Sequence, residues 1–302
     1  MPTPKESLHA FSATQDYLVC IDSDGCAFDT MGIKQRECFC PWMIEAFNLQ
    51  PVAEAARECK EFADLFSKTR GANRHVTIKR ILTELLPSHP TVQSRGFSAP
   101  THPAYFAWVD NANSLLSNEG LAAAVEAETD PSAKEELSSI LDWSERVNWA
   151  VGEIVKGIPP FPGVGDALQM LQGKADVAVV SATPLEALLR EWAEHDIARY
   201  TALICGQEMG PKREHISVLG SPYARENILM VGDAPGDLRS AQANDVLFFP
   251  IIPGDEEASW QEFTGEGLER FFAGTYRGMY EQQLLERFDR ALPETPPWEG
   301  QS

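Results

Sequence analysis

Five short apolar runs constrain the fold of this chain more than any other feature of its sequence. They are nearly continuous in β-branched and aliphatic residues, a pattern typical of strands that are buried on both faces. The runs lie at residues 17–22, 176–181, 202–205, 228–232 and 246–251. Amphipathic helical patterns alternate with the last four runs, at residues 164–172, 184–195 and 235–243. Strands that alternate with helices in this way predict an α/β fold with a doubly wound parallel sheet.

A long stretch of helical character separates the first run from the second. Residues 32–157 show amphipathic helical patterns and almost no strand signal. Clusters of turn-forming residues at 29–32 and 157–163 mark the two ends of this stretch as linkers. We therefore expect a Rossmann-like core made of residues 1–31 and 158–252, with an all-helical domain, 32–157, inserted after the first strand.

The C-terminal part of the chain is also helical in character. Apolar side chains recur at helical spacing between Leu268 and Phe288, which predicts one long helix that covers the core. We expect residues 253–302 to form a helical extension packed on the core. Trp260 is expected to be a packing residue, and residues 295–298 are expected to form a draped tail.

The composition excludes several classes of protein. Of the 302 residues, 43% are hydrophobic and 23% are charged, as in ordinary soluble proteins, and no apolar stretch is long enough to cross a bilayer. A net charge of −20 disfavours nucleic-acid backbones and anionic membranes as partners, because the long-range field repels both. The N-terminal residues carry no secretory signal, so we expect a cytoplasmic protein.

Two aspartates follow the first strand directly. In Asp22-Ser23-Asp24-Gly25 an apolar run ends and a glycine turn begins, so both carboxylates emerge at a strand's C-terminal end. Open α/β sheets bind ligands at this edge, and aspartate is a recognised nucleophile toward phosphoryl groups. The pair alone also fits a plain turn, whereas the glycine comes too early for an EF-hand. Cys26 lies in the same loop, so its oxidation would block such a site. We otherwise expect the six cysteines to be free, buried thiols.

Later strand ends bring further polar residues to the same edge. Ser181 offers a hydroxyl beside the backbone N–H groups of a helix start, where an anion is favourably held. Lys212 follows the third strand, whereas Lys174 precedes the second and is expected at the opposite end of the sheet. Asp233 and Asp237 follow the fourth strand. Each residue alone is typical of a helix cap or a surface position, but their shared edge indicates a common site.

This set of residues resembles the motifs of the haloacid dehalogenase superfamily, in its magnesium-dependent phosphatase and phosphomutase branch. The resemblance rests on Asp22-Ser-Asp24-Gly, Ser181, Lys212 and Gly232-Asp-Ala-Pro-Gly-Asp237, and it spans about residues 16 to 252. The inserted helical module looks like the mobile cap of that family. Two positions depart from the family pattern: Cys26 stands where threonine or valine is usual, and Lys212 lies outside the common Gly-Lys-Pro context.

The resemblance implies a role for each residue of the set. Asp22 would be the nucleophile, Asp24 the general acid and base, and Mg²⁺ the cofactor. The implied metal ligands are Asp22, Asp24 through its backbone carbonyl, Asp233 and Asp237; the implied phosphate contacts are Ser181, Lys212, Gly25 and Ala182. The aspartate at position 24 favours phosphate esters, because the dehalogenases of this family have no acidic residue there.

A basic loop in the helical module is a candidate substrate contact. Arg70, Gly71 and Arg74 form an Arg-Gly-x-x-Arg arrangement that resembles the substrate loop of hexose-phosphate mutases in the same superfamily. Guanidinium groups placed there would hold a second phosphate or a carboxylate of the substrate. A solvated helix start capped by Asn73 or Thr69 is an equally good interpretation of this segment.

The leading hypothesis is a Mg²⁺-dependent phosphatase that hydrolyses a small organic phosphate monoester through an aspartyl-phosphate intermediate. One alternative is a phosphomutase of the β-phosphoglucomutase type, since the same residues serve both reactions. An alternative of another class is a non-catalytic phospholigand-binding or regulatory module. The expected partner is a small phosphorylated metabolite, with no nucleic acid and no membrane, and the expected assembly is a monomer or homodimer.

Overall fold

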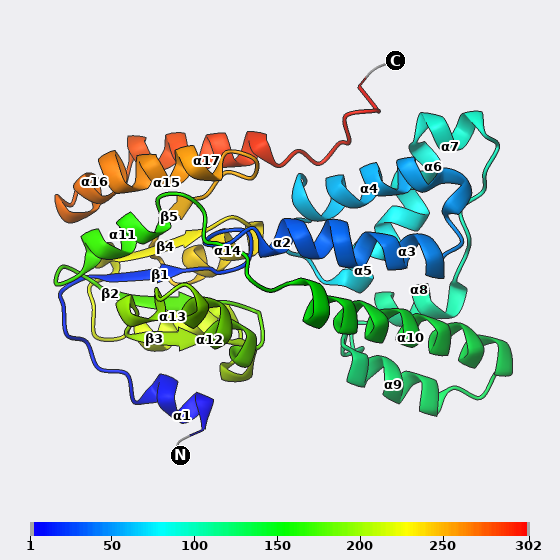
Figure 1. The fold of residues 1–302 in the computed structure, drawn as a ribbon, viewed down its shortest axis with the longest axis horizontal. Coiled ribbons are helices and arrows are strands. Elements are labelled where there is room, and N and C mark those ends of the chain that lie inside the picture. Colours follow the sequence, from blue (N-terminus) through cyan, green and yellow to red (C-terminus); the bar gives the residue numbers. More distant parts are fainter. Residues whose placement is uncertain (1–2, 301–302) are drawn as a thin grey trace. The chain divides into compact units, whose positions relative to one another are not determined.

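The structure is a computed structural model that describes residues 3–300 of the chain. These residues form two compact units, coloured by sequence in Figure 1. The core unit comprises 3–31 and Gly157–Leu292, and the helical unit comprises Gly32–Lys156 together with 293–300. The boundaries between core and insertion lie within one residue of those expected from the sequence.

Five strands of the described residues form one parallel sheet in the core unit. They are β1 (Leu18–Ile21), β2 (Asp176–Val180), β3 (Leu203–Cys205), β4 (Ile228–Gly232) and β5 (Leu247–Pro250). Their order in the sheet is β3-β2-β1-β4-β5, and all four pairings are parallel. The predicted α/β fold class is therefore confirmed. Because β1 lies between β2 and β4, the strand order reverses at β1, which is where open α/β sheets bind their ligands.

Helices cover both faces of this sheet. They are α1 (Pro4–His9), α11 (Val164–Leu171), α12 (Leu185–Glu194), α13 (Lys212–Leu219), α14 (Pro235–Ala243), α15 (Glu256–Glu262), α16 (Leu268–Phe272) and α17 (Met279–Ala291). Val19 and Ile21 of β1 share an apolar cluster with side chains of α11, α12, α15 and α16. Leu18 and Cys20 share another with side chains of α1, α13 and α14. Apolar burial on both faces explains why the strands lack alternating polarity.

The C-terminal part of the core unit differs from the single long helix predicted for it. Helix α16 ends at Phe272 and α17 begins at Met279. Between them Gly274 and Gly278 adopt φ angles of 67° and 110°, a region of the backbone that favours glycine and ends a helix. The helical spacing of apolar residues continues across this turn because both helices pack on the same core.

The described residues 32–156 contain helices as their regular elements. Helix α2 (Thr30–Ile33) leads into a π-helical segment, Lys34–Phe39, and the others are α3 (Cys40–Ala46), α4 (Ala53–Leu65), α5 (Arg74–Arg80), α6 (Leu86–Ser88), α7 (Pro90–Ser94), α8 (Pro103–Asp110), α9 (Asn118–Ala127) and α10 (Pro131–Ile154). Aromatic side chains fill the interior of this unit. Trp143 of α10 packs edge-on against Phe47 with ring centroids 5.7 Å apart, and both rings are buried.

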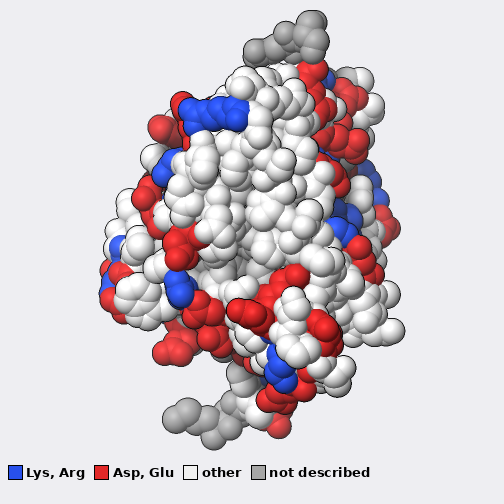
Figure 2. All heavy atoms as spheres, turned by 90° about the vertical axis from the view of Figure 1, so that its right-hand side faces the viewer, with Lys and Arg blue, Asp and Glu red and all other residues white. Residues whose placement is uncertain are grey.

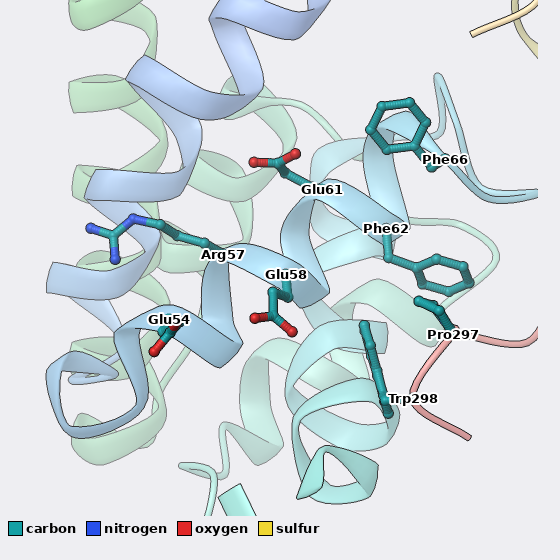
Figure 3. Close-up of a pocket in the computed structure, with 8 residues that line it drawn as sticks. All are labelled: Glu54, Arg57, Glu58, Glu61, Phe62, Phe66, Pro297 and Trp298. Atoms are coloured by element: carbon teal, nitrogen blue, oxygen red, sulfur yellow. The ribbon is translucent and has the colours of Figure 1, made fainter. Parts of the chain in front are cut away.

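The C-terminal tail packs with the helical unit instead of with the core, which corrects the expectation that residues 253–302 pack on the core as a whole. Trp298 lies edge-on against Phe62 of α4 and donates from Nε1 to Ser88 Oγ over 3.2 Å. Arg80 donates to the carbonyl of Glu294 over 2.9 Å. The tail lines a groove of about 590 Å³ together with α4 and the residue that follows it. Figure 3 shows the lining residues Glu54, Arg57, Glu58, Glu61, Phe62, Phe66, Pro297 and Trp298.

The surface carries mixed charge. On the face drawn in Figure 2, Lys and Arg side chains are scattered among acidic ones around a largely uncharged central area. Among residues 3–300, no helix is long and apolar enough to cross a membrane.

Candidate active site

The sheet brings three chain segments to one edge. Ile21, the last residue of β1, is paired with Val179 of β2 and with Val231 of β4. The strands are parallel, so the residues that follow them emerge side by side at the carboxyl edge. Asp22 continues this pairing, since its N–H donates to the carbonyl of Val231 over 3.0 Å. Asp22 and the residues that follow β2 and β4 are therefore neighbours.

Three of the predicted carboxylates form a buried cluster. Ligand atoms of Asp22, Asp233 and Asp237 all lie within 4.8 Å of one another, and each residue as a whole is at most 3% exposed. Asp237 lies in the first turn of α14, where its Oδ2 accepts from the N–H groups of Asp233 and Ala234 over 3.2 and 3.1 Å. Asp237 thus fixes the backbone of the loop that carries Asp233.

Gly232 makes this arrangement possible. A Cβ atom at position 232 would lie 2.6 Å from Cγ of Asp237, closer than real side chains approach each other. The glycine at the end of β4 is therefore required for the carboxylate of Asp237 to reach the cluster.

Lys212 is the cation of the site. Its Nζ lies 2.7 Å from Oδ2 of Asp22 and 2.6 Å from Oδ1 of Asp237, at the start of α13. The structure thus places Lys212 at the site in spite of its unusual sequence context. Lys174 comes just before β2, at the amino end of the sheet, and its Nζ lies 5.8 Å from the ring centroid of Phe272.

The cluster carries more negative than positive charge. Burial raises the pKa of Asp22 above its ordinary value, Asp237 and Asp233 raise it further, and Lys212 acts in the opposite direction. Burial alone would lower the pKa of Lys212, but Asp22 and Asp237 hold it well above its ordinary value. Three carboxylates and one ammonium leave a charge of −2 when all four are ionised. A divalent cation would balance that charge, and carboxylate oxygens are the ligands that Mg²⁺ prefers.

Asp24 lies outside the acidic cluster and has its own hydrogen bonds. Its Oδ2 accepts from the hydroxyl of Thr183 over 2.8 Å, and its Oδ1 accepts from the hydroxyl of Thr30. Neither threonine is predicted from the sequence as a site residue. Both lie close in sequence to motif residues, but a hydrogen bond between the loops after β1 and β2 becomes evident only once the strands are paired. Asp22 and Asp24 are thus in different environments, the first within the acidic cluster and the second bonded to threonine hydroxyls.

Of the other predicted phosphate contacts, Ser181 is buried, Ala182 is exposed and Gly25 forms a turn. Ser181 is 2% exposed and its Oγ accepts from the N–H of Thr183 over 3.3 Å, while Ala182 is exposed beside it. Gly25 adopts a φ of 80°, and its N–H donates to the carbonyl of Phe28 over 2.8 Å. Gly25 therefore shapes the turn, and its N–H is already bonded within that turn instead of being directed at a phosphate.

Two buried tryptophans support the loop after β1. Trp192 donates from Nε1 to Ser23 Oγ over 3.0 Å, and Trp260 donates to the carbonyl of Cys26 over 2.9 Å. Cys26 itself is fully buried, and burial together with the nearby carboxylates raises its thiol pKa well above the ordinary value. A buried thiol of high pKa is unreactive, so the structure disfavours the oxidation hypothesis for this residue.

The candidate substrate loop lies in the helical unit, and its arginines have partners there. Arg70 is 5% exposed and donates to the carbonyl of Leu65 over 2.8 Å. Arg74 donates to Ser144 Oγ and Asn148 Oδ1 over 3.0 and 2.8 Å, and burial lowers its pKa to about 10. Gly71 adopts a φ of 72° in the turn between them. These contacts favour a structural role for both guanidinium groups over direct contact with a substrate.

The solved structures that this chain resembles share little of its sequence. No protein-family model and no curated protein matches the sequence. A haloacid dehalogenase-like hydrolase from Streptococcus pneumoniae is 12% identical, with 84% of this chain and 98% of that chain covered and a TM-score of 0.42. A HAD-superfamily hydrolase of subfamily IA from Geobacter sulfurreducens is 16% identical, with 79% and 90% covered and a TM-score of 0.38. A protein described as a predicted phosphoglycolate phosphatase from Haemophilus somnus is 16% identical, with 78% and 85% covered and a TM-score of 0.42. With TM-scores below 0.5, these likenesses carry no weight for activity, which has to be derived from the site itself.

Proposed function

We propose that the protein is a Mg²⁺-dependent phosphatase that hydrolyses a small organic phosphate monoester through an aspartyl-phosphate on Asp22. The observation that carries the proposal is the buried cluster at the edge of the sheet, in which Lys212 bridges Asp22 and Asp237. A nucleophile, a fixed cation and a carboxylate set suited to a divalent metal are the groups that phosphoryl transfer needs.

Asp22, Asp233 and the backbone carbonyl of Asp24 would hold the metal. Both oxygens of Asp237 already accept hydrogen bonds, from Lys212 and from two backbone N–H groups, which suits it to orienting the site. The chemistry that Mg²⁺ supplies when bound is charge screening between an anionic nucleophile and an anionic phosphoryl group.

The protein's own residues account for the remaining steps. A carboxylate oxygen of Asp22 attacks phosphorus, the bond from phosphorus to the leaving alkoxide breaks, and Asp24 donates a proton to that alkoxide. Asp24 then removes a proton from the water that attacks the aspartyl-phosphate, which releases inorganic phosphate and restores Asp22. Lys212 and Ser181 would stabilise the oxygens of the phosphoryl group during both transfers.

The proposal is tested by turnover of p-nitrophenyl phosphate and of a panel of phosphate monoesters, with and without Mg²⁺. Asp22→Asn should abolish Mg²⁺-dependent release of phosphate, whereas Asp166→Asn, an exposed aspartate on α11, should leave it unchanged. Absence of turnover across the panel, or an unchanged Asp22→Asn variant, would refute the enzyme and favour a phospholigand-binding module. Conversion of a sugar phosphate to its isomer without release of phosphate would indicate the phosphomutase instead. The cytoplasmic location, the small-metabolite partner and the monomer or homodimer stay predictions from the sequence.

A further inference from the structure

Both carboxylate oxygens of Asp24 accept hydrogen bonds from threonine hydroxyls. Thr183 Oγ1 donates to Oδ2 over 2.8 Å, and the Thr30 hydroxyl donates to Oδ1. Thr30 is the first residue of α2, whereas Thr183 follows β2, so the two donors come from different segments of the core unit. The orientation of this carboxylate is therefore set by side chains that do not belong to the acidic cluster.

The loop that carries Thr183 is itself fixed by backbone contacts. The N–H of Thr183 donates to Ser181 Oγ over 3.3 Å, and its carbonyl accepts from the N–H of Gln207 over 3.0 Å. Two residues later, the N–H of Leu185 donates to Oε2 of Glu208 over 2.9 Å. The loop after β2 is thus anchored to the loop after β3, and the Thr183 hydroxyl has a defined position.

We propose that Thr183 is a positioning residue for Asp24, an inference that rests on the proposed phosphatase function. In that function Asp24 is protonated at one stage of the turnover and ionised at another. A hydroxyl both donates and accepts, so Thr183 can donate to the ionised carboxylate and accept from the protonated carboxyl, whereas a lysine or a backbone N–H can only donate. Because the N–H of Thr183 also donates to Ser181 Oγ, one residue connects Asp24 with the hydroxyl that is proposed to bind the phosphate.

The leaving group of the substrate reveals whether Asp24 is correctly oriented. An alkyl phosphate releases a strongly basic alkoxide and depends on a proton from Asp24, whereas p-nitrophenolate leaves readily without one. The ratio kcat/KM reports the steps up to formation of the aspartyl-phosphate, so later hydrolysis does not mask the difference. A defect in positioning Asp24 should therefore be larger for the alkyl ester.

The test compares Thr183→Val, which removes the hydroxyl at nearly constant volume, with Thr183→Ser, which keeps it. Misplacement of a catalytic group by about 1 Å costs on the order of 100-fold, so Thr183→Val should lower kcat/KM for the alkyl phosphate about 10- to 100-fold. The same variant should lower kcat/KM for p-nitrophenyl phosphate less than about threefold, and Thr183→Ser should stay within about threefold of wild type for both esters. Thr201→Val is the matched control, because its hydroxyl donates to the carbonyl of Ala198 over 2.8 Å in a turn of the same unit.

The outcomes separate this inference from the function on which it rests. Equal losses for the two esters, no loss, or a Thr183→Ser variant as impaired as Thr183→Val would overturn the positioning role while wild-type turnover stands. Lack of wild-type turnover of either ester would overturn the proposed function and this inference with it. Thermal unfolding of each variant is measured alongside, and Thr183→Ala replaces Thr183→Val if the latter does not fold, with the same expected selectivity.

Discussion

Removal of the ammonium of Lys212 should destabilise the core unit strongly. In the variant Lys212→Met, the carboxylates of Asp22 and Asp237 lose a cation that lies 2.7 and 2.6 Å from them. The side chains of these aspartates are 4% and 1% exposed, so water cannot replace the ammonium. The variant therefore leaves buried negative charge without its counterion, which is far more costly than the loss of a surface pair.

The expected magnitude follows from the burial of the two partners. Loss of one partner from a buried ion pair costs about 3 to 5 kcal/mol, and Lys212 itself is 15% exposed, which favours the lower end. A loss of about 3 kcal/mol in a unit of this size lowers the midpoint of thermal unfolding by roughly 6 to 12 °C. Lys5→Met is the matched control, since Lys5 pairs with Glu214 at 3.5 Å with its side chain 57% exposed. Its effect should stay below about 1 kcal/mol.

Acidification should reduce the deficit of Lys212→Met. Burial raises the pKa of Asp22 and Lys212 opposes this shift, so the pKa should rise further in the variant. A carboxyl group whose pKa is raised on folding makes its full contribution to stability below its unfolded pKa, where it is protonated in both states. This contribution is lost as the pH rises through the folded pKa, because the buried group then becomes charged. Because the pKa of Asp22 in the wild type is already raised to about 8, the difference from wild type should be larger at about pH 9 than at about pH 6.

Scanning calorimetry in the presence of a chelator measures this prediction, because it separates the transitions of the two units. Saturating Mg²⁺ should restore part of the lost stability, since the metal supplies positive charge to the same carboxylates. An unfolding midpoint within 2 °C of wild type, or a deficit that does not change between the two pH values, would refute the electrostatic account of the cluster.

Three further predictions concern other parts of the molecule. Asp176→Asn should lower stability by about 1 to 3 kcal/mol at neutral pH, because this carboxylate accepts from the hydroxyls of Thr14 and Tyr223, over 2.6 Å each, and from two backbone N–H groups. Those hydrogen bonds lower the pKa of Asp176 in spite of its burial. The stability that Asp176 contributes is therefore present above its unfolded pKa and is lost as the pH falls through its folded pKa. Urea titrations at several pH values would measure this loss of stability. Trp298→Ala should lower the unfolding midpoint of the helical unit and leave that of the core unit unchanged, since the ring of Trp298 packs on Phe62 of the helical unit. An equal fall of both unfolding midpoints would contradict the assignment of the tail to the helical unit. Cys26 should react with a thiol reagent only after denaturation, because it is fully buried with a raised thiol pKa; rapid labelling of the native protein would contradict its placement.

The sequence predicted those features that depend on local pattern. Continuous apolar runs identify buried strands, and Asp22 and Asp233 are located simply because they follow such runs. Lys212 is expected at the same edge because it follows the third strand, and the structure supplies its two ion pairs with Asp22 and Asp237.

Features that depend on tertiary pairing were not predicted. The hydrogen bond from Thr183 to Asp24 joins residues 159 positions apart, and it forms only because β1 and β2 are neighbours. The charge of Arg74 is evident in the sequence and is compatible with a substrate contact or a solvated helix start, whereas its partners Ser144 and Asn148 lie about 70 positions away in α10. The helical spacing of apolar residues between Leu268 and Phe288 predicts that residues 253–302 pack on the core, but this pattern ends before Trp298, whose ring packs on Phe62 of α4.

The central claim is that Asp22 is the nucleophile and Asp24 the general acid and base. A burst experiment on Asp24→Asn tests this claim most directly. With p-nitrophenyl phosphate and Mg²⁺, this variant should still transfer the phosphoryl group to Asp22, because p-nitrophenolate needs no proton, but it should hydrolyse the aspartyl-phosphate slowly. Stopped-flow absorbance should then show a rapid release of about one equivalent of p-nitrophenolate followed by slow turnover, and Asp22→Asn should show no release. Steady turnover by Asp24→Asn without a burst, or a burst that persists in Asp22→Asn, would contradict the assignment of nucleophile and general base.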